Sequence, residues 1–246
     1  MNDLGSYIER INASGTPDEA FAVFCEALNR YGYDRIAYTL CTDHPSLKLP
    51  KQHGLATSYP DDWMKYYVEK DYINVDPVIR ELMASRKPFF WDDVTARDDT
   101  PRDSVLLMNE AADAKVRDGI GISLVGRKGE IVGVGIARSD GYKGRDFEFL
   151  AAANLLSVYF HETFRSMIEE PVRVTLTERE KEILCWAAEG KIDEDIATLL
   201  NISTNTVRYH WKNIFIKLEA NGKIYAITKA IRLELIFPNV ITYQKW

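Results

Sequence analysis

The 246-residue sequence predicts an α+β chain in which helices surround an antiparallel sheet and a small all-helical domain follows. Two apolar runs at 120–125 and 131–137 predict the sheet, because a five-residue loop with two glycines separates them, as in a β-hairpin. Helical spacing of apolar residues on both sides of this hairpin predicts the surrounding helices. A proline-containing interruption of the helical pattern at 169–175 predicts the boundary between these two domains.

The elements of the first part follow from local periodicity and composition. The segment Arg35–Thr42 is rich in β-branched and aromatic residues and predicts a strand. A long closing helix is predicted at 146–168, where one apolar stripe consists of Phe147, Leu150, Ala151, Leu155, Val158, Phe164 and Ile168. The other predicted helices are 18–30, 61–69, 76–85 and 104–116.

A domain boundary is predicted near 169–175. Pro171 disfavours helical geometry at Glu170, and the capping box Thr177–Glu180 then begins a new helix. Net charge changes at the same place: residues 172–246 carry 11 basic and 9 acidic side chains, whereas the first 171 carry a net charge of −8. We therefore expect a domain at 1–168, a linker at 169–175 and a domain at 176–246, with different partners.

Composition excludes several classes of protein. With 46% hydrophobic and 28% charged residues the chain is neither disordered nor low in complexity. Three widely spaced cysteines argue against a disulfide framework and a zinc site. The sequence has no apolar run of membrane-spanning length and no signal peptide pattern, so we expect a soluble cytoplasmic protein. Residues 121–126 fail the GxSxG spacing and the four histidines form no catalytic set, so we expect no enzyme, no metal and no cofactor.

The C-terminal part has the outline of a DNA-binding motif. Helices are predicted from 178 to 189 and from 193 to 200, and Ser203 caps a third helix after the turn at 201–202. The third helix turns an apolar stripe inward and places Arg208 and Lys212 outward. Residues 203–223 include four basic residues and one acidic residue. This positive local charge is suitable for contacts with phosphates and guanine edges. Spacing alone leaves open that these are solvated charges of an interaction domain.

The sequence of this part resembles the LuxR-type helix-turn-helix family over about 176–236. The resemblance is carried by LTEREKEIL at 176–184, by ISTNTVRYH at 202–210 and by further matches at 190–191, 196–197, 213–214 and 217–218. It departs at Ile192, where the family usually has Ser or Thr, and at Asp195, where it usually has Glu. The resemblance implies base contacts from Arg208 and Lys212, and phosphate contacts from Lys191, Ser203, Thr204 and Thr206.

A second pattern lies in the N-terminal part. Tyr59, Trp63 and Tyr67 recur every four residues and would line one side of a helix, presenting hydroxyl and indole donors along an apolar wall. Asp76 stands among apolar neighbours, which suggests a sheltered carboxylate that needs a donor. Taken alone, the same pattern is compatible with an aromatic core stripe and an Asp-Pro helix start.

Together with DPV at 76–78 and PFFW at 88–91, this pattern resembles the acyl-homoserine-lactone-binding domain of LuxR-type quorum-sensing regulators over about 15–168. The resemblance implies an α/β/α sandwich around an antiparallel sheet. It implies that Trp63 donates to the lactone carbonyl, Asp76 accepts from the ligand amide and Tyr59 donates to the acyl carbonyl. Tyr67 and Trp91 would pack against the lactone ring.

Two members of this set lack an expected hydroxyl. Gly135 stands where the family commonly has Ser or Thr, and Val78, two residues after Asp76, has no hydroxyl. We therefore expect weaker hydrogen bonding to a 3-oxo group of the ligand. Gly121, Gly133 and Gly135 also remove volume from the sheet, which could accommodate a larger acyl group or mark bulges. An Asp76 left unpaired without ligand should destabilise the domain.

These observations predict a transcriptional regulator in quorum sensing that binds an N-acyl-homoserine lactone and, as a homodimer, a pseudo-palindromic double-stranded operator. The helix at 146–168 and the segment 224–236 are the expected dimer contacts, although either stripe could belong to a domain core. The alternative is an orphan regulator of the same architecture that responds to another small molecule or to none.

Overall fold

The computed structural model describes residues 3–42, 52–97, 100–126, 129–141, 144–168 and 174–237, and its main division into two compact units falls between residues 169 and 170. The N-terminal side of the predicted linker, residues 169–173, lies outside the described residues. No helix in the described part of the chain combines the length and the apolar character that a membrane span requires.

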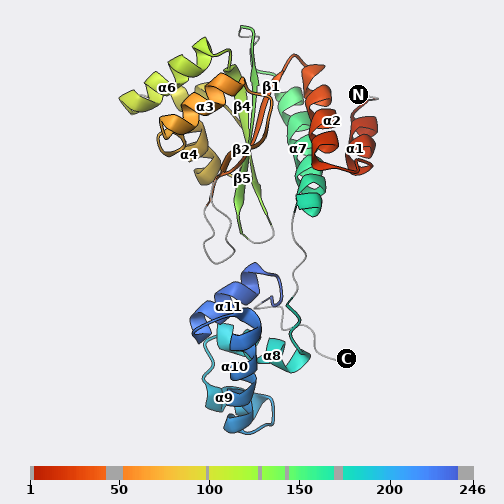
Figure 1. Cartoon of the computed structure of the whole chain (residues 1–246), viewed down its shortest axis with the longest axis vertical. Helices are drawn as coiled ribbons and strands as arrows, with labels where there is room; N and C mark the ends of the chain where they lie inside the picture. The colour runs from red at the N-terminus through yellow and green to blue at the C-terminus, as the bar shows by residue number, and fades with distance from the viewer. Residues whose placement is uncertain are drawn as a thin grey trace. The chain divides into compact units, whose positions relative to one another are not determined.

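The first unit contains a five-stranded antiparallel sheet with the order β2-β1-β5-β4-β3. Figure 1 shows α1, α2 and α7 on one face of this sheet and α3, α4 and α6 on the other. The predicted fold class, including the α/β/α sandwich, is therefore confirmed. The strands are β1 (Arg35–Leu40), β2 (Gln52–Thr57), β3 (Phe89–Phe90), β4 (Arg117–Val125) and β5 (Ile131–Arg138).

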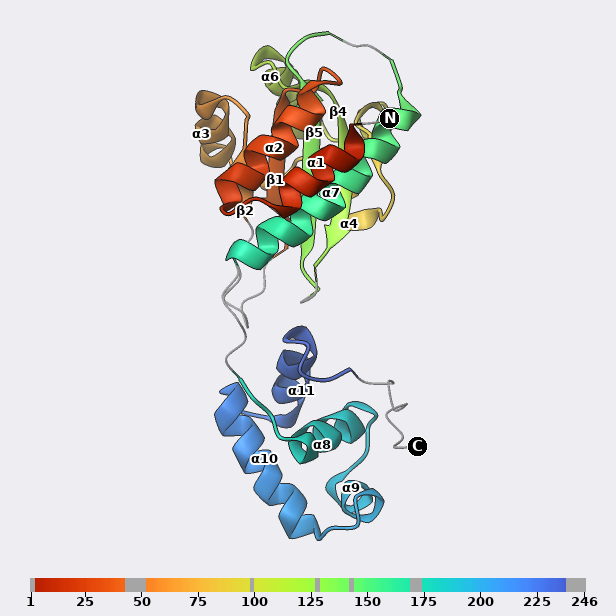
Figure 2. The ribbon, with the colours of Figure 1, turned by 90° about the vertical axis from the view of Figure 1, so that its right-hand side faces the viewer.

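The helices of the first unit form two groups. In the first group, α1 (Leu4–Asn12), α2 (Pro17–Asn29) and α7 (Phe147–Ile168) contact one another side by side (Figure 2). The second group contains α3 (Asp61–Glu69), α4 (Pro77–Ala84) and α6 (Arg102–Asp113), together with the short α5 (Asp92–Thr95) and the 3-10 turn η2 (Tyr72–Asn74).

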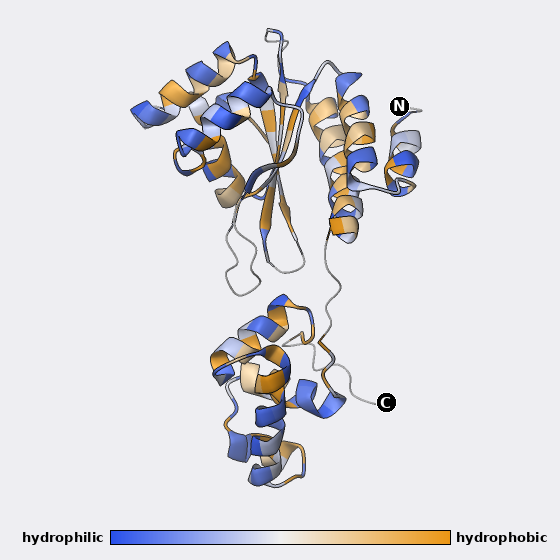
Figure 3. Ribbon diagram, in the orientation of Figure 1, coloured by the Kyte–Doolittle hydropathy of each residue, from blue (hydrophilic) through white to orange (hydrophobic). Residues whose placement is uncertain are grey.

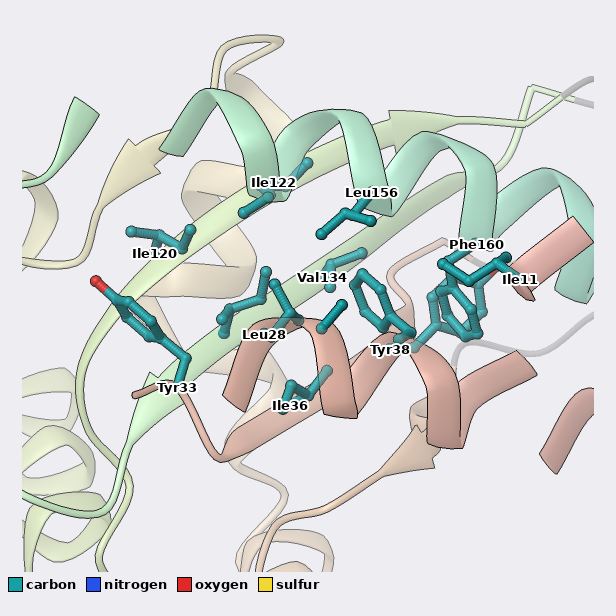
Figure 4. Close-up of a cluster of buried hydrophobic side chains, with 14 of the residues drawn as sticks. Ile11, Leu28, Tyr33, Ile36, Tyr38, Ile120, Ile122, Val134, Leu156 and Phe160 are labelled. Carbon is teal, nitrogen blue, oxygen red and sulfur yellow. The ribbon is translucent and has the colours of Figure 1, made fainter. Parts of the chain in front are cut away.

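The two faces of the sheet carry side chains of different size, because successive residues of a strand point to opposite faces. The face toward α2 and α7 is covered by large apolar residues that form the main core (Figure 4). The face toward α3 and α4 is built from small residues. The large residues are Ile36, Tyr38, Leu40, Ile120, Ile122, Val132, Val134 and Ile136; the small ones are Ala37, Thr39, Cys41, Gly119, Gly121, Gly133, Gly135 and Ala137.

Gly121 and Gly133 do not leave empty room, so for these two glycines the expectation of space for a larger acyl group is wrong; Gly135 lines the cavity described below. A Cβ atom at Gly121 would collide with the Phe89 ring, and one at Gly133 would collide with Leu82. The volume that these two glycines give up is already filled by Phe89 of the neighbouring strand β3 and by Leu82 of α4. The glycines allow these side chains to pack closely on the backbone of the sheet.

Helix α7 does not have the single apolar stripe expected from the sequence. Phe164 lies buried in the main core, whereas Phe147, Leu155 and Val158 are exposed. The core contacts come from another face of the helix, which includes Leu156 and Phe160 (Figure 4). The predicted stripe therefore combined residues from two faces, and part of it is an exposed apolar surface.

Within residues 174–237, the second unit has four helices around one small core: α8 (Glu178–Ala188), α9 (Asp193–Leu199), α10 (Thr204–Leu218) and α11 (Lys223–Arg232). The predicted capping box at Thr177 and Glu180 is present in both directions. The predicted inward stripe of α10, Val207, Trp211, Ile214 and Leu218, is buried. Figure 3 shows the resulting mixture of polar and apolar residues along these short helices.

A buried ion pair joins two of these helices. The Glu180 carboxylate, which is 2% exposed, accepts hydrogen bonds from the Lys217 ammonium at 2.7 Å and from the Thr177 amide at 2.8 Å. Burial by itself would raise the pKa of Glu180, but these hydrogen bonds outweigh it and hold the pKa below its ordinary value of 4.5. Lys217 therefore has a structural role in fixing α10 to the start of α8.

In Lys217→Ala, we expect the free energy of unfolding of the second unit to fall by about 2 kcal/mol, because the buried carboxylate loses a charged hydrogen-bond partner. Hydrogen exchange of α8 and α10 amides in the full chain measures this change. Because the Glu180 pKa is lowered, its contribution is fully present above pH 4.5 and disappears as the pH falls through the folded pKa. Lys212→Ala, an exposed change on the same helix, is the control; equal protection in the two variants would contradict the assignment.

Candidate functional site

A cavity lies between the small-residue face of the sheet and the helices α3, α4 and α6. The cavity is narrow, with a volume of about 40 Å³, and apolar and aromatic side chains form most of its wall. All seven ligand-site residues predicted from the sequence line this one cavity, although they are spread over 77 positions of the chain. They are Tyr59, Trp63, Tyr67, Asp76, Val78, Trp91 and Gly135.

Asp76 is the acidic group of the cavity and also the N-cap of α4. Its Oδ1 atom accepts from the amides of Val78 at 2.7 Å and Ile79 at 3.3 Å, and its Oδ2 atom accepts from the Tyr67 hydroxyl at 2.8 Å. The following Pro77 occupies the first helical position, where its missing N–H costs nothing. One carboxylate thus connects α3, α4 and the cavity.

The expectation that Asp76 is unpaired without a ligand is therefore wrong. Burial raises the pKa of this carboxyl above its ordinary value of 3.8, while the hydrogen bonds from Tyr67 and the two amides oppose the rise. A carboxylate offers about four lone-pair positions, so Asp76 can accept a further hydrogen bond at Oδ2. The site presents an acceptor that is already held in place.

The aromatic side chains reach the cavity from different local structures. Trp63 and Tyr67 lie on α3 and are one turn apart, as predicted. Tyr59 precedes this helix, which begins at Asp61, so the expectation that all three share one helical side is wrong for Tyr59. Its hydroxyl oxygen lies 3.0 Å from the position a Cβ atom at Gly135 would take. The absent side chain at Gly135 therefore lets the Tyr59 hydroxyl lie against β5.

Trp91 forms another part of the cavity wall. Its indole ring lies directly on Gly119, where an added Cβ would come within 2.6 Å of the ring. The indole Nε1 is buried and has no hydrogen-bond partner among the described residues. An unpartnered N–H in a buried position is costly, so a ligand acceptor at this place would be favoured.

The cavity wall also contains residues that the sequence interpretation missed. Thr39 and His53 come from β1 and β2, and Leu107, Met108 and Ala111 come from α6. Only the β-strand at 35–42 and the helix near 104–116 were predicted, without any site role. The alternation of large and small residues along β1 could have placed Thr39 on the cavity face.

Helix α6 is held over the cavity by polar contacts at both ends. Near its start, the buried Ser104 hydroxyl donates to the Val75 carbonyl at 2.7 Å. One turn from its end, the Glu110 carboxylate accepts from the hydroxyls of Tyr66 and Tyr72. Because Tyr66 belongs to α3 and Tyr72 to η2, the position of α6 depends on the same segment that supplies the site residues.

The side chains of this cavity are suited to binding a small molecule. Its wall combines one carboxylate acceptor, the hydroxyl of Tyr59 and the indoles of Trp63 and Trp91 with apolar side chains, and the Trp91 N–H is unpartnered among the described residues. Burial, together with the charge of Asp76, raises the pKa of Tyr59, so its hydroxyl stays protonated and can donate. A molecule with one N–H, several carbonyl oxygens and an apolar part would match this set.

The second unit contains the helix-turn-helix geometry in α9 and α10. Asn201 in the turn has a φ of 51°, a left-handed conformation that asparagine tolerates well. Ser203 caps α10 by accepting from the Thr206 amide at 3.0 Å, and the two hydroxyls are also hydrogen-bonded. Ile192 makes no cap hydrogen bond at the start of α9 and is 60% exposed, which matches its departure from the family pattern.

The structure separates the basic residues around α10 into two kinds. Lys217 and Lys223 bind Glu180 and Asp193 within the unit, at 2.7 Å and 2.6 Å. Arg208 and Lys212 are exposed, and the contact of Arg208 with Glu194 is long at 3.9 Å. The sequence count of +3 therefore overstates the positive charge available to a partner. Of the other DNA-contact candidates, Lys191 and Ser203 are exposed, and Thr204 and Thr206 are partly exposed.

Comparisons with known proteins agree with this architecture. The family described as "Autoinducer binding domain" matches residues 16–164, and the family described as "Bacterial regulatory proteins, luxR family" matches residues 174–230. The transcriptional activator protein VanR of Vibrio anguillarum is 31% identical over 192 residues, covering 76% of this chain and 78% of VanR. The quorum sensing-dependent regulator RpaR of Rhodopseudomonas palustris is 34% identical, covering 74% of each chain.

Among solved structures, the crystal structure of Escherichia coli SdiA superposes with a TM-score of 0.77 at 24% identity, over 96% of this chain and 98% of SdiA. At this identity the likeness supports the fold. The family matches cover both units, and the family consists of transcriptional regulators and not of enzymes. The chain therefore belongs to the LuxR family of bacterial regulatory proteins, with an autoinducer binding domain followed by a DNA-binding helix-turn-helix region.

Proposed function

We propose that the protein is a quorum-sensing transcription factor that binds an N-acyl-homoserine lactone and, as a homodimer, a pseudo-palindromic operator in the cytoplasm. In this proposal residues 1–168 form the ligand-binding and dimerisation domain, 169–175 the linker and 176–246 the DNA-binding domain. The observation that carries it is that Asp76, Tyr59, Trp63 and Trp91, which together offer one acceptor and three donors, line one cavity with an otherwise apolar wall.

The chemistry of the ligand matches this arrangement. An acyl-homoserine lactone has one amide N–H, two strong carbonyl acceptors and an apolar tail. Asp76 Oδ2 accepts from the amide, Tyr59 donates to the acyl carbonyl and Trp63 donates to the lactone carbonyl. Tyr67 and Trp91 flank the lactone ring, and Val78 and Gly135 contribute shape without a hydroxyl.

DNA binding is assigned to the exposed face of α10. Arg208 and Lys212 lie one turn apart on this face, where they can reach base edges in the major groove. Lys191, Ser203, Thr204 and Thr206 lie near the helix start and contact phosphates in this proposal. Ser203 and Thr206 also hold the helix cap, so both would act through their remaining hydrogen-bonding capacity.

Two exposed apolar surfaces support dimer formation. On α7, Leu155 and Val158 lie on the exposed side of a helix whose other side fills the core. On α11, Ile224 is 83% exposed and Ile231, seven residues later, is 40% exposed. Exposed apolar stripes of this kind are typical of protein interfaces, and a dimer places two copies of α10 on the half-sites of one operator.

In Asp76→Asn, we expect the ligand-dependent increase in thermal stability to disappear. The amide keeps an oxygen for capping α4, but an NH₂ group replaces the acceptor for the ligand N–H. Wild type should gain about 2.7 kcal/mol at a lactone concentration 100 times the Kd. Thermal unfolding followed by circular dichroism with a panel of lactones measures this gain.

Asp62→Asn, an exposed change on α3, serves as the control for Asp76→Asn. A full ligand response in Asp76→Asn would refute the role of the carboxylate. Stabilisation of wild type by none of the lactones would favour the orphan regulator instead.

In Arg208→Ala, we expect specific DNA binding to weaken by about 1–3 kcal/mol, because a guanidinium can contact a guanine through two hydrogen bonds. Fluorescence anisotropy with operator and random duplexes at one fixed salt concentration provides the measurement. Lys181→Ala, which removes a basic side chain of α8 outside the proposed contact set, is the comparison. An equal loss on both duplexes would instead make Arg208 a phosphate contact.

In the double variant Leu155→Arg and Val158→Arg, we expect a lower association constant of the homodimer, since two charges replace apolar contact area on α7. The variant should therefore dissociate at a higher protein concentration than the wild type. Analytical ultracentrifugation with bound lactone determines the association constant. Arginines at the exposed positions Glu148 and Glu162 of the same helix control for added positive charge. An unchanged association constant in the double variant would remove α7 from the interface.

A further inference from the structure

This inference rests on the proposed function and concerns the chemical class of the acyl group. We propose that His53 selects ligands whose acyl chain carries an oxygen atom, by donating a hydrogen bond from its Nε2–H to that oxygen. The sequence interpretation gave His53 no role and expected weaker binding of a 3-oxo group, because Gly135 and Val78 lack a hydroxyl. His53 would supply a donor for this oxygen from another element, the edge strand β2.

The position of His53 places its ring in the aromatic part of the cavity. The imidazole stacks on the Tyr67 ring with centroids 4.1 Å apart and planes 18° apart, and its centroid lies 6.3 Å from that of Tyr59. The Nε2 atom is buried and has no hydrogen-bond partner among the described residues. His53 is thus next to the two tyrosines assigned to the lactone and the acyl carbonyl.

The hydrogen bonds of Thr39 favour a proton on Nε2 of His53. The Thr39 hydroxyl is buried; it accepts from the Gly54 amide at 3.3 Å and lies 3.1 Å from His53 Nδ1. Donation of its own hydrogen to Nδ1 satisfies the hydroxyl, which has no other acceptor among the described residues. Nδ1 is then an acceptor, and a neutral ring must carry its proton on Nε2.

The ring is neutral at physiological pH. Burial lowers the pKa of His53 to about 4, since the charged form loses its hydration. The group presented to the cavity is consequently an N–H donor without a formal charge. Such a donor suits a carbonyl or hydroxyl oxygen, and it does not suit a bare methylene.

A count of donors and acceptors indicates where this oxygen belongs. In the proposed function the two carbonyl oxygens of a plain acyl-homoserine lactone are assigned to Trp63 and Tyr59, and its acyl chain beyond the amide carbonyl offers no acceptor to the neighbouring His53. His53 Nε2 would stay unpaired in the complex. A 3-oxo or 3-hydroxy substituent adds the missing acceptor, and a site built to bond an oxygen discriminates against the analogue that lacks it.

Binding of matched lactones to the full-length protein tests the proposal. Isothermal titration calorimetry with unsubstituted, 3-oxo and 3-hydroxy acyl-homoserine lactones, compared at equal chain length, should give about 3- to 10-fold tighter binding of an oxygenated ligand to wild type. In His53→Phe the ring still stacks on Tyr67 but has no N–H. Oxygenated and unsubstituted lactones should therefore bind this variant with about equal Kd values. His210→Phe, in the second unit, should keep it.

Lactone binding by wild type without any preference, or a preference that persists in His53→Phe, would overturn the role of His53 and leave the proposed function intact. Failure of every lactone to bind wild type would overturn both. If His53→Phe does not fold, the ¹⁵N shifts of the His53 ring in wild type decide: protonated Nε2 that shifts only with oxygenated ligands supports the proposal, and protonated Nδ1 refutes it.

Discussion

The close approach of the helical layer to one face of the sheet is the constraint on which the first unit depends. Glycines and other small residues alternate with large ones along β4 and β5, so one face is nearly bare backbone. Trp91 at the start of α5 and Leu82 of α4 lie directly on this backbone, and Phe89 of the neighbouring strand β3 covers Gly121. Larger residues at the glycine positions would separate the layers and displace the side chains that form the cavity wall.

Because of this packing, the candidate site is also the second core of the unit. Tyr59, Trp63 and Tyr67 are as buried as ordinary core residues, and Asp76 is 8% exposed. Asp76 caps α4 and binds Tyr67 of α3, so one carboxylate stabilises the wall that a ligand would complete. A ligand that contacts Asp76 therefore adds contacts to an existing framework, and its binding is linked to the stability of the fold.

Much of this organisation was predictable from local pattern. Capping signals and periodicity placed α3, α7 and α8 within one or two residues, since their determinants lie within each helix. The prediction missed α1 and also β2, whose QHGLAT sequence has no clear alternation and depends on pairing with β1. The contact of His53 with Tyr67 and the filling of the strand glycines are long-range effects that a single sequence does not reveal.

In the second unit, fewer basic side chains are available to DNA than the sequence of α10 and its surroundings contains. Lys217 and Lys223 stabilise the unit by binding buried or partly buried carboxylates, which leaves Arg208 and Lys212 as the outward cations of α10. Two outward cations give one copy a limited electrostatic contribution to affinity. Joining two copies makes the second contact effectively intramolecular and raises the overall affinity without new contacts. In the homodimer proposed above, control of dimer formation by the first unit would therefore control DNA binding by the second.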